Sequence, residues 1–318
     1  MKKFSLILAE PEDVHVKAVM EHIKEYPNCE ALWIDTEHSL SNLNVDFKFD
    51  NGWSGTLNGF DISNINSIWY RRPKSPKAGE EFVHKYFASL AEDEMRAVLH
   101  NFYRISNCPV LPHPGFNREA DHKLLQLKVA NSIGFKTPFT VMTNNKNWEK
   151  DIPESIEYYC VKAISAYHWV TDDGSEFSLK SAKVHKNELQ EHSKDFGLCP
   201  TLLQEYIEKK YEWRVTVIGK EIFACRLDSQ KVKGAEADWR IVDVHKIPHK
   251  LMDLPTEMNN KILEYLNQFN LDFGAFDFIQ TENDEFIFLE CNPNGQWLWI
   301  ELFTGARISK SIANYLFK

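Results

Sequence analysis

Two short apolar segments near the end of the chain each contain a carboxylic acid, and this pattern constrains the fold more than any other. Asp277 lies between Phe276 and Phe278, and Glu290 ends a second apolar run that is followed by Asn292. Apolar runs of this length, separated by the turn-forming residues TEND, are typical of a β-hairpin. A charge inside such a strand is costly to bury without a partner. The hairpin must therefore bring each acid to a cation or to water.

The alternation of side chains along a strand decides which groups meet. Glu290 and Asn292 lie on the same face because they are two residues apart. Asp277 shares that face if the hairpin loop has an even number of residues, and faces away if the number is odd. On the first arrangement two carboxylates and an amide oxygen converge, a set of hard donors that suits Mg²⁺ better than zinc. The alternative is that both acids lie at a sheet margin, in water or in ion pairs. The opposite face is expected to carry a core of Phe276, Phe278, Ile287 and Leu289.

The first third of the chain alternates strand-like and helix-like segments. Three apolar runs have the length of strands: Phe4–Ala9, Ala31–Asp35 and Ile65–Tyr70. The apolar residues between the first two recur with helical spacing, which predicts a small open α/β domain. A long helix is expected from about 78 to 105, and the prolines of CPVLPHPG mark a boundary near Gly115.

The remainder combines helices with a strand-rich region. Asn117 is expected to cap a helix that runs to about Ser132 and stops at Gly134. A later helix is expected to bury one face, made of Met258, Ile262, Tyr265, Leu266 and Phe269. Further strands are predicted at 158–164, 201–206, 213–218 and 221–227, and a last helix at 308–317.

The composition excludes several classes of function. The net charge of the 318 residues is −9, whereas a nucleic-acid binder needs basic surface. The six cysteines form no CxxC pair and the twelve histidines no HExxH motif, so a zinc site is not expected. The first apolar run is too short for a signal peptide, and no segment has the length of a membrane span. A cytoplasmic location is therefore expected.

Four basic residues are candidates for binding phosphate. Lys162 is the only charge in the strand-like run YYCVKAI, Lys123 lies early in a helix, and Arg226 and Arg240 complete the set. A nucleotide with Mg²⁺ needs such cations, although each residue taken singly is equally compatible with a solvated surface charge. The segment LLQEYIEKKYEWRV joins two strands through a charged turn, where adenine can bind backbone groups and an acid can bind ribose.

In this order the motifs resemble the ATP-grasp superfamily, which includes glutathione synthetase and D-alanine–D-alanine ligase. The resemblance covers most of the chain from Asn117 onward. It implies that Lys123 and Lys162 contact the phosphates of ATP and that Glu212 holds ribose. It implies an adenine site at Gln204, Glu205, Tyr206 and Ile207. The implied Mg²⁺ ligands are Asp277, Glu290 and Asn292, in the D…E-x-N order of the family.

A narrower resemblance is to the microviridin, or graspetide, maturation ligases. It rests on the strings SIWYRRP, NREADHKLLQLKVANSIGFKTP, YEWRVTVIG, DWR and NPNGQWLWIE. These ligases join Asp or Glu side chains of a ribosomal precursor peptide (leader plus core) to hydroxyls or Lys amines. The resemblance implies an α/β (α+β) fold in three parts: an N-terminal pre-ATP-grasp domain at 1–115, a central subdomain at 116–200 and a catalytic C-terminal subdomain at 201–318. It also implies a homodimer. One departure is the phosphate loop after Lys162, which has Gly174 as its single glycine.

We therefore expect an enzyme that uses ATP and Mg²⁺ to convert a peptide carboxylate into an acyl phosphate, from which a hydroxyl or an amine displaces phosphate. Arg226 would help to neutralise the phosphates, and Arg240, with Arg71 or Arg72, would hold the incoming carboxylate. Two alternatives stay open: a ligase that adds a free amino acid to a peptide or metabolite, and an ATP-binding module without turnover.

Overall fold

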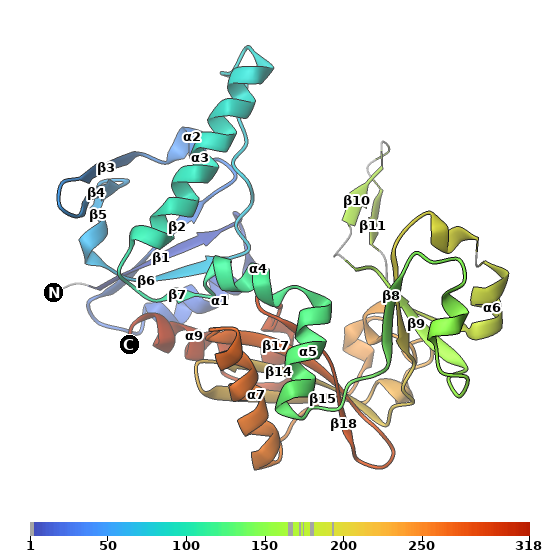
Figure 1. Ribbon diagram of the computed structural model, residues 1–318. Coiled ribbons are helices and arrows are strands. Elements are labelled where there is room, and N and C mark those ends of the chain that lie inside the picture. Colours follow the sequence, from blue (N-terminus) through green and yellow to red (C-terminus); the bar gives the residue numbers. More distant parts are fainter. Residues whose placement is uncertain (1–2, 165–167, 172, 174, 179–180, 193) are drawn as a thin grey trace.

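The computed structural model describes residues 3–164, 168–171, 173, 175–178, 181–192 and 194–318. Figure 1 shows an N-terminal lobe at the upper left, a central lobe at the right and the C-terminal strands and helices below them. The mixed α/β architecture predicted from the sequence is confirmed. No helix in the described part of the chain combines the length and the apolar character that crossing a membrane requires.

The N-terminal lobe is built on a parallel sheet in the order β2-β1-β6-β7. Its strands are β1 (Lys3–Ala9), β2 (Cys29–Asp35), β6 (Ile65–Arg71) and β7 (Val110–Leu111), and its helices are α1 (Val14–Ile23), α2 (Ser39–Asn42), η1 (Ile62–Asn64) and α3 (Lys85–Ile105). A small antiparallel sheet adds β3 (Val45–Phe49), β4 (Trp53–Leu57) and β5 (Phe60–Asp61). The three predicted strands are confirmed. The long helix begins at Lys85 rather than near 78, after His84, whose side chain caps the helix by accepting a hydrogen bond from the N–H of Tyr86 at 3.4 Å.

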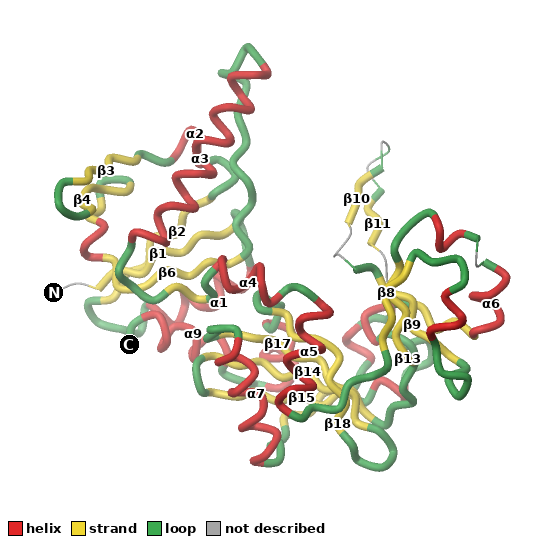
Figure 2. The backbone as a smooth tube through the Cα atoms, in the orientation of Figure 1, coloured by secondary structure: helices red, strands yellow, loops and turns green. Residues whose placement is uncertain are grey.

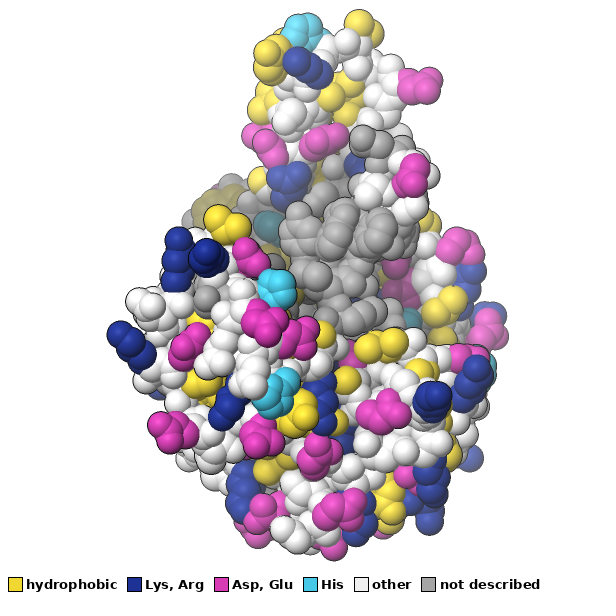
Figure 3. All heavy atoms as spheres, turned by 90° about the vertical axis from the view of Figure 1, so that its right-hand side faces the viewer, with side chains coloured by type: hydrophobic (Ala, Val, Ile, Leu, Met, Phe, Trp, Pro, Cys, Tyr) yellow, Lys and Arg dark blue, Asp and Glu magenta, His cyan; other side chains and the backbone are white. Residues whose placement is uncertain are grey.

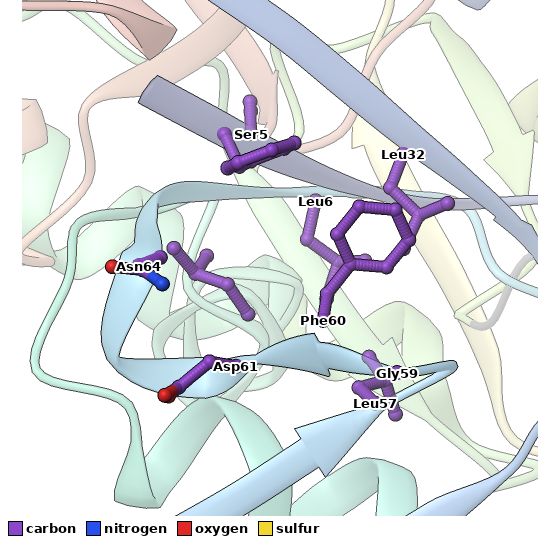
Figure 4. A pocket seen from close by; sticks show the side chains of 10 residues that line it. Ser5, Leu6, Leu32, Leu57, Gly59, Phe60, Asp61 and Asn64 are labelled. Carbon is purple, nitrogen blue, oxygen red and sulfur yellow. The ribbon is translucent and has the colours of Figure 1, made fainter. Parts of the chain in front are cut away.

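An apolar cavity of about 290 Å³ lies in this lobe, between β1 and the turn after β4 (Figure 4). Leu6, Leu57 and Phe60 are among the residues that line it. In Figure 4 the carboxylate of Asp61 points away from Leu57 and Phe60. Asp61 instead accepts hydrogen bonds from the N–H and the hydroxyl of Ser63, at 2.8 and 2.7 Å. The walls of this cavity thus offer an apolar surface rather than catalytic groups.

Two short helices follow where one was predicted: α4 (Pro114–Ala120) and α5 (Lys123–Ile133). The prediction that Asn117 caps the helix is wrong, because His113 is the N-cap of α4 and Pro114 occupies its first position. Asn117 lies inside α4. The end of α5 at Gly134 is confirmed, with a φ of 90° that favours glycine.

The central lobe contains an antiparallel sheet in the order β12-β9-β13-β8. These strands are β8 (Thr140–Thr143), β9 (Tyr158–Lys162), β12 (Ala182–His185) and β13 (Thr201–Glu205), accompanied by η2 (Trp148–Asp151), α6 (Lys186–Glu191) and η3 (Asp195–Gly197). A hairpin of β10 (His168–Val170) and β11 (Glu176–Ser178) extends from this lobe in Figure 1. A boundary at 200 would divide the sheet, since β13 pairs with both β8 and β9. Gly174 lies outside the described residues.

The C-terminal sheet is antiparallel, in the order β16-β15-β14-β17-β18. Its strands are β14 (Tyr211–Ile218), β15 (Glu221–Leu227), β16 (His249–Leu251), β17 (Phe273–Gln280) and β18 (Phe286–Asn292), and the short helices η4 (Ser229–Lys231), η5 (Trp239–Ile241) and η6 (Val244–Lys246) lie between β15 and β16. One face is covered by α5 and by α7 (Thr256–Gln268), as Figure 2 shows. The buried face predicted for α7 is confirmed. The opposite face meets α8 (Leu298–Thr304), α9 (Ile308–Leu316) and the N-terminal lobe.

The hairpin of β17 and β18 brings the two acids together by an indirect route. Gln280 pairs with Phe286, so the loop spans residues 281–285 and has an odd length. An odd loop alone would turn Asp277 away from Glu290. However, the register shifts next to Asp277, and Leu289 is the additional residue of a β-bulge. Asp277 therefore pairs directly with Glu290.

The same bulge changes the predicted core. Phe288 joins the other phenylalanines of the hairpin in the core under α5 and α7. The placement of Ile287 and Leu289 in that core is wrong. Leu289 lines a cavity on the opposite face of the sheet, and Ile287 pairs with Ile279, which lines the same cavity.

The loop that follows Asn292 is held by the N-terminal lobe. Arg71 is buried, donates to the carbonyl and the side-chain oxygen of Asn294 at 3.2 and 3.0 Å, and lies 3.4 Å from Asp13. Asp13 caps α1, and His15 in that helix accepts a hydrogen bond from the N–H of Trp297 at 3.5 Å. Open α/β sheets usually bind ligands at the carboxyl ends of their strands. Here that position receives the loop of the C-terminal lobe.

Candidate active site

Glu290 stands between two cations. Lys123, the first residue of α5, donates to Oε2 of Glu290 at 3.2 Å, and Nη1 of Arg240 lies 3.6 Å from Oε1. Burial alone would raise the pKa of Glu290, but the charges of Lys123, Arg240 and Lys162 outweigh it and lower the pKa. Glu290 is therefore ionised at neutral pH.

Asp277 has its own cation on the neighbouring strand. Nη1 of Arg214 lies 3.0 Å from Oδ1 of Asp277, and Nη2 donates to the carbonyl of Gln296 at 3.0 Å. Only 6% of Arg214 and 8% of Asp277 are exposed, so the ion pair is largely desolvated. The sequence analysis did not identify Arg214. Its position two residues after Glu212 in a strand was the available signal, because that spacing puts both charges on one face.

Asp277, Glu290 and Asn292 thus lie along one face of adjacent strands. Among the described residues no group of three or more His, Cys, Asp or Glu side chains is placed to hold a metal alone. Two carboxylates and an amide oxygen nevertheless fit Mg²⁺, which keeps few protein ligands and completes its shell with water and phosphate oxygens. Both acids are also in ion pairs, so the arrangement agrees with both of the predicted alternatives.

A cavity of about 660 Å³ opens beside this face. It lies between the start of α5, β8 and the end of β18, and its lining includes Asp121, Lys123, Gln126, Met142, Glu290 and Asn292. Burial and the charge of Glu290 raise the pKa of Asp121. Figure 3 shows one face of the molecule, on which basic and acidic side chains are interspersed.

Gln126 fixes the end of β18 from α5. Its side-chain nitrogen donates to the carbonyls of Cys291 and Ala120 at 2.9 and 2.6 Å, and its oxygen accepts from the N–H of Cys291 at 2.8 Å. Cys291 lies between Glu290 and Asn292. The side chain of Gln126 is therefore a buried brace for both predicted metal ligands, and its place one helical turn after Lys123 was the signal for it.

The structure gathers the predicted adenine and ribose residues around a narrow cavity between the central and C-terminal sheets. It is lined by Lys162, Gln204, Glu205, Tyr206, Ile207 and Glu212, among others. Lys162 donates to Oε1 of Gln204 at 2.5 Å, and burial lowers the pKa of Lys162 more than the charge of Glu290 raises it. The cavity measures about 40 Å³. A purine would enter only if the two sheets moved apart.

Two acids at this cavity already have partners. Oε2 of Glu205 accepts from the N–H of Phe139 at 3.2 Å. Oε1 of Glu212 accepts from Lys209 at 2.9 Å and from the hydroxyl of Ser229 at 2.7 Å. Burial raises the pKa of Glu212, and Lys209 opposes this effect.

On the far side of Asn292 lies an arginine-rich cavity of about 640 Å³. Arg72, Arg214, Arg240, Asn292 and Gln296 contribute its polar lining. Arg240 makes a two-pronged contact with Asp238, at 2.8 and 3.3 Å. Burial alone would lower the pKa of Arg240, but the carboxylates of Asp277 and Asp238 outweigh this effect, so the pKa is raised. This cavity is therefore suited to an anion such as a carboxylate.

The other predicted arginines divide into one that joins the site and two that do not. Arg72 lines the arginine-rich cavity, donates to the carbonyl of Asn294 at 3.0 Å and has a φ of 44°, an unusual value for a residue with a side chain. Arg71 is buried, holds the loop described above and is not part of the lining of the arginine-rich cavity, so the structure does not bring it to the place where a carboxylate would bind. Arg226 also lies away from the other predicted site residues. It pairs with Trp213 on the opposite face of the sheet and lies 4.1 Å above the ring of Tyr211.

The chain is similar to known proteins of solved structure. No protein-family model matches the chain, and no curated protein is similar to it. Solved structures match almost its whole length. The RiPP-associated ATP-grasp ligase of Chryseobacterium gregarium, in complex with ADP and a leader and core peptide, has a TM-score of 0.89 and 31% identity, over 99% of this chain and 96% of that chain.

Two further solved structures have a similar fold. The macrocyclase MdnC of Microcystis aeruginosa MRC, bound with its precursor peptide MdnA, gives a TM-score of 0.82 and 26% identity, over 98% of this chain and 99% of that chain. D-alanyl-alanine synthetase A of Vibrio cholerae gives 0.58 and 10% identity, over 99% of this chain and 97% of that chain. The last likeness concerns the fold alone.

Proposed function

The chain belongs to the RiPP-associated ATP-grasp ligases, and from this membership we propose that it closes macrocycles in a ribosomal precursor peptide with the energy of ATP. It activates Asp or Glu side chains and joins them to hydroxyls or amines as ω-esters or ω-amides. One observation carries the proposal. Asn292 lines both a lysine-containing cavity, which it shares with Glu290, and an arginine-rich cavity, and Asp277 pairs directly with Glu290.

ATP would occupy the first of these two sides. Lys123 and Lys162 bind the phosphates, Gln204 to Ile207 hold adenine, and Glu212 holds ribose. The lowered pKa of Lys162 supports this role, because the buried ammonium has a neutral partner, Gln204, and would be stabilised by a phosphate. Binding also requires the narrow cavity between the sheets to widen, so we propose that the central lobe moves when the nucleotide enters.

The divalent cation would bind Asp277, Glu290 and Asn292. When bound, Mg²⁺ supplies positive charge to the phosphate oxygens during phosphoryl transfer. Lys123 would then shift from Glu290 to the phosphates. Arg214 would keep its hydrogen bond to the carbonyl of Gln296 and so remain aimed at the arginine-rich cavity.

The peptide carboxylate would enter that cavity and bind Arg240, with Arg214 and Arg72 beside it. Its oxygen attacks the γ-phosphorus, a carbon–oxygen–phosphorus link forms, and ADP leaves. A hydroxyl or amine of the same peptide then attacks the acyl carbon, phosphate takes the electron pair of the broken bond, and the nucleophile loses its proton. Each ring therefore consumes one ATP and removes the elements of one water from the peptide.

The test is co-expression of the chain with each short peptide gene that neighbours its own gene, followed by mass spectrometry. The expected result is a loss of one water mass per ring, which depends on ATP and Mg²⁺ in the purified system. Mild base opens esters and leaves amides intact, which identifies the linkage. A gain of one amino-acid residue would instead support the free-amino-acid ligase, and a peptide without effect on phosphate release would support the ATP-binding module.

We further propose that the enzyme is a homodimer. Tyr86, Phe87 and Leu90 are spaced along one side of the outer end of α3, and 70, 66 and 54% of their surfaces are exposed, while Val83, two residues before the helix begins, is 99% exposed. Such a stripe on a projecting helix can pair with its own copy about a two-fold axis. Light scattering should find a dimer that Phe87→Glu converts to a monomer, whereas a monomeric wild-type chain would contradict the proposal.

A further inference from the structure

The arginine-rich cavity has a second, apolar wall that carboxylate binding does not require. Trp239, Val242, Val244 and Trp299 line it together with the guanidinium groups. The rings of Trp239 and Trp299 meet at 5.1 Å between centroids, with planes inclined by 45°. Both tryptophans are half-buried, so each has one part in the protein interior and another toward the cavity. A cavity for a carboxylate alone would gain nothing from these rings.

The apolar wall is fixed from behind. Trp239, Val242 and Trp299 pack against the main core between the C-terminal sheet and the N-terminal lobe. His249 supports Trp299 with ring centroids 5.3 Å apart, and Phe303 stacks on His249 at 4.7 Å. A wall braced in this way keeps its shape when it is empty, which lowers the entropy lost on binding.

The apolar surface also continues out of the cavity. Leu302 lies one helical turn after Trp299 on α8, and 75% of it is exposed. Ile241, next to Arg240, is 54% exposed. The cationic side of the cavity is therefore joined to an apolar strip that leads to the surface, and this combination matches a peptide in which an acidic side chain has an apolar neighbour.

We propose that Trp239 and Trp299 form a subsite for a large apolar side chain of the core peptide, located within two residues of the acid that is activated. This inference deepens the proposed function and rests on it. The arginines recognise the charge of the acid, and the tryptophan wall selects among the acids of the peptide by the residue beside each one. The peptide residue it accepts has the size of leucine, phenylalanine or tyrosine.

The experiment uses the full-length enzyme and the precursor identified by its loss of water. Each residue within two positions of the modified acid is replaced by alanine, and kcat/KM is measured for wild type and for Trp299→Ala. Replacement of one apolar peptide residue by alanine should lower kcat/KM of the wild-type enzyme about tenfold or more, the usual range for an apolar group in a pocket. The same replacement should lower kcat/KM of Trp299→Ala much less. Trp299→Ala should raise KM for the peptide while KM for ATP stays the same.

Two additions keep the result decisive. Val244→Glu places a charge on the same wall without touching the main core and should reproduce the rise in peptide KM, even if Trp299→Ala folds poorly. Leu198→Ser, at an 84% exposed site in the central lobe, is the matched control and should leave both KM values unchanged. Equal sensitivity of wild type and Trp299→Ala to every peptide substitution would overturn the subsite alone. Absence of water loss with wild type would overturn the proposed function as well.

Discussion

The ion pair of Arg214 and Asp277 allows the structural and catalytic roles of Asp277 to be separated. Asp277→Asn removes the charge that faces a guanidinium group of which only 6% is exposed. Removal of one partner of a buried pair costs about 3–5 kcal/mol. We expect about 3 kcal/mol here, because asparagine keeps an acceptor for Nη1 and Gln296 keeps its bond to Nη2. Thermal unfolding should show a Tm lower by about 4–5 °C, because the unfolding entropy of a chain of 318 residues is about 2.1 cal/mol/K per residue.

The double variant Asp277→Asn with Arg214→Gln decides between the roles. A neutral pair of similar size is often as stable as a buried ion pair, so the double variant should recover most of the lost Tm. It should not recover ATP- and Mg²⁺-dependent loss of water from the peptide, because it lacks both the carboxylate of a metal ligand and the guanidinium group of Arg214 in the arginine-rich cavity. Recovery of both stability and turnover would refute the reasoning, since Asp277 would then serve only as the partner of Arg214. The assay is mass spectrometry of the peptide beside a thermal melt of each variant.

Three further predictions concern the supports of the site. Gln126→Leu leaves buried backbone groups of β18 without partners, at about 1–3 kcal/mol each, and should lower both Tm and ATP turnover, measured by a melt and by phosphate release. Gly295→Ala would place a Cβ 2.7 Å from Nη2 of Arg214 and should raise peptide KM in steady-state kinetics. Burial raises the pKa of Asp13, but the hydrogen bonds with His15 and the charges of Arg71 and His15 together outweigh burial and lower the pKa to about 2. Its carboxylate therefore stabilises the fold above its ordinary pKa of 3.8 and loses this effect toward pH ~2, so the Tm difference between wild type and Asp13→Asn should shrink as pH falls.

Local patterns predicted the elements of the fold well where one periodicity dominates. The strands of the N-terminal lobe, the buried face of α7 and the stop at Gly134 follow from alternation, helical spacing and the preference of glycine for positive φ. The predicted ATP-grasp fold is confirmed by the solved structures. The subdomain boundary predicted at 200 falls just before β13, which pairs with β8 and β9, because strand pairing joins segments that are far apart in the chain.

The site was predictable for residues whose role depends on chemistry within one segment. The structure brings Lys123 to Glu290 and Lys162 to Gln204, and their roles toward phosphate and Mg²⁺ stay predictions. Arg71 and Arg226 failed for a geometric reason. A guanidinium group looks the same in the sequence whether it braces a loop, stacks on a ring or faces a substrate, and only the three-dimensional neighbours distinguish these uses.

The β-bulge at Leu289 shows why a register argument from sequence can reach the right pair by an incomplete route. The loop has an odd number of residues, which alone would place Asp277 and Glu290 on opposite faces of the hairpin. The additional residue of the bulge brings them back to the same face. Leu289 itself turns to the nucleotide side, where it lines the narrow cavity beside Lys162. Bulges concentrate near active sites because they redirect a side chain without ending the strand. Here one inserted residue both aligns the two acids and adds an apolar side chain to the lining of the narrow cavity.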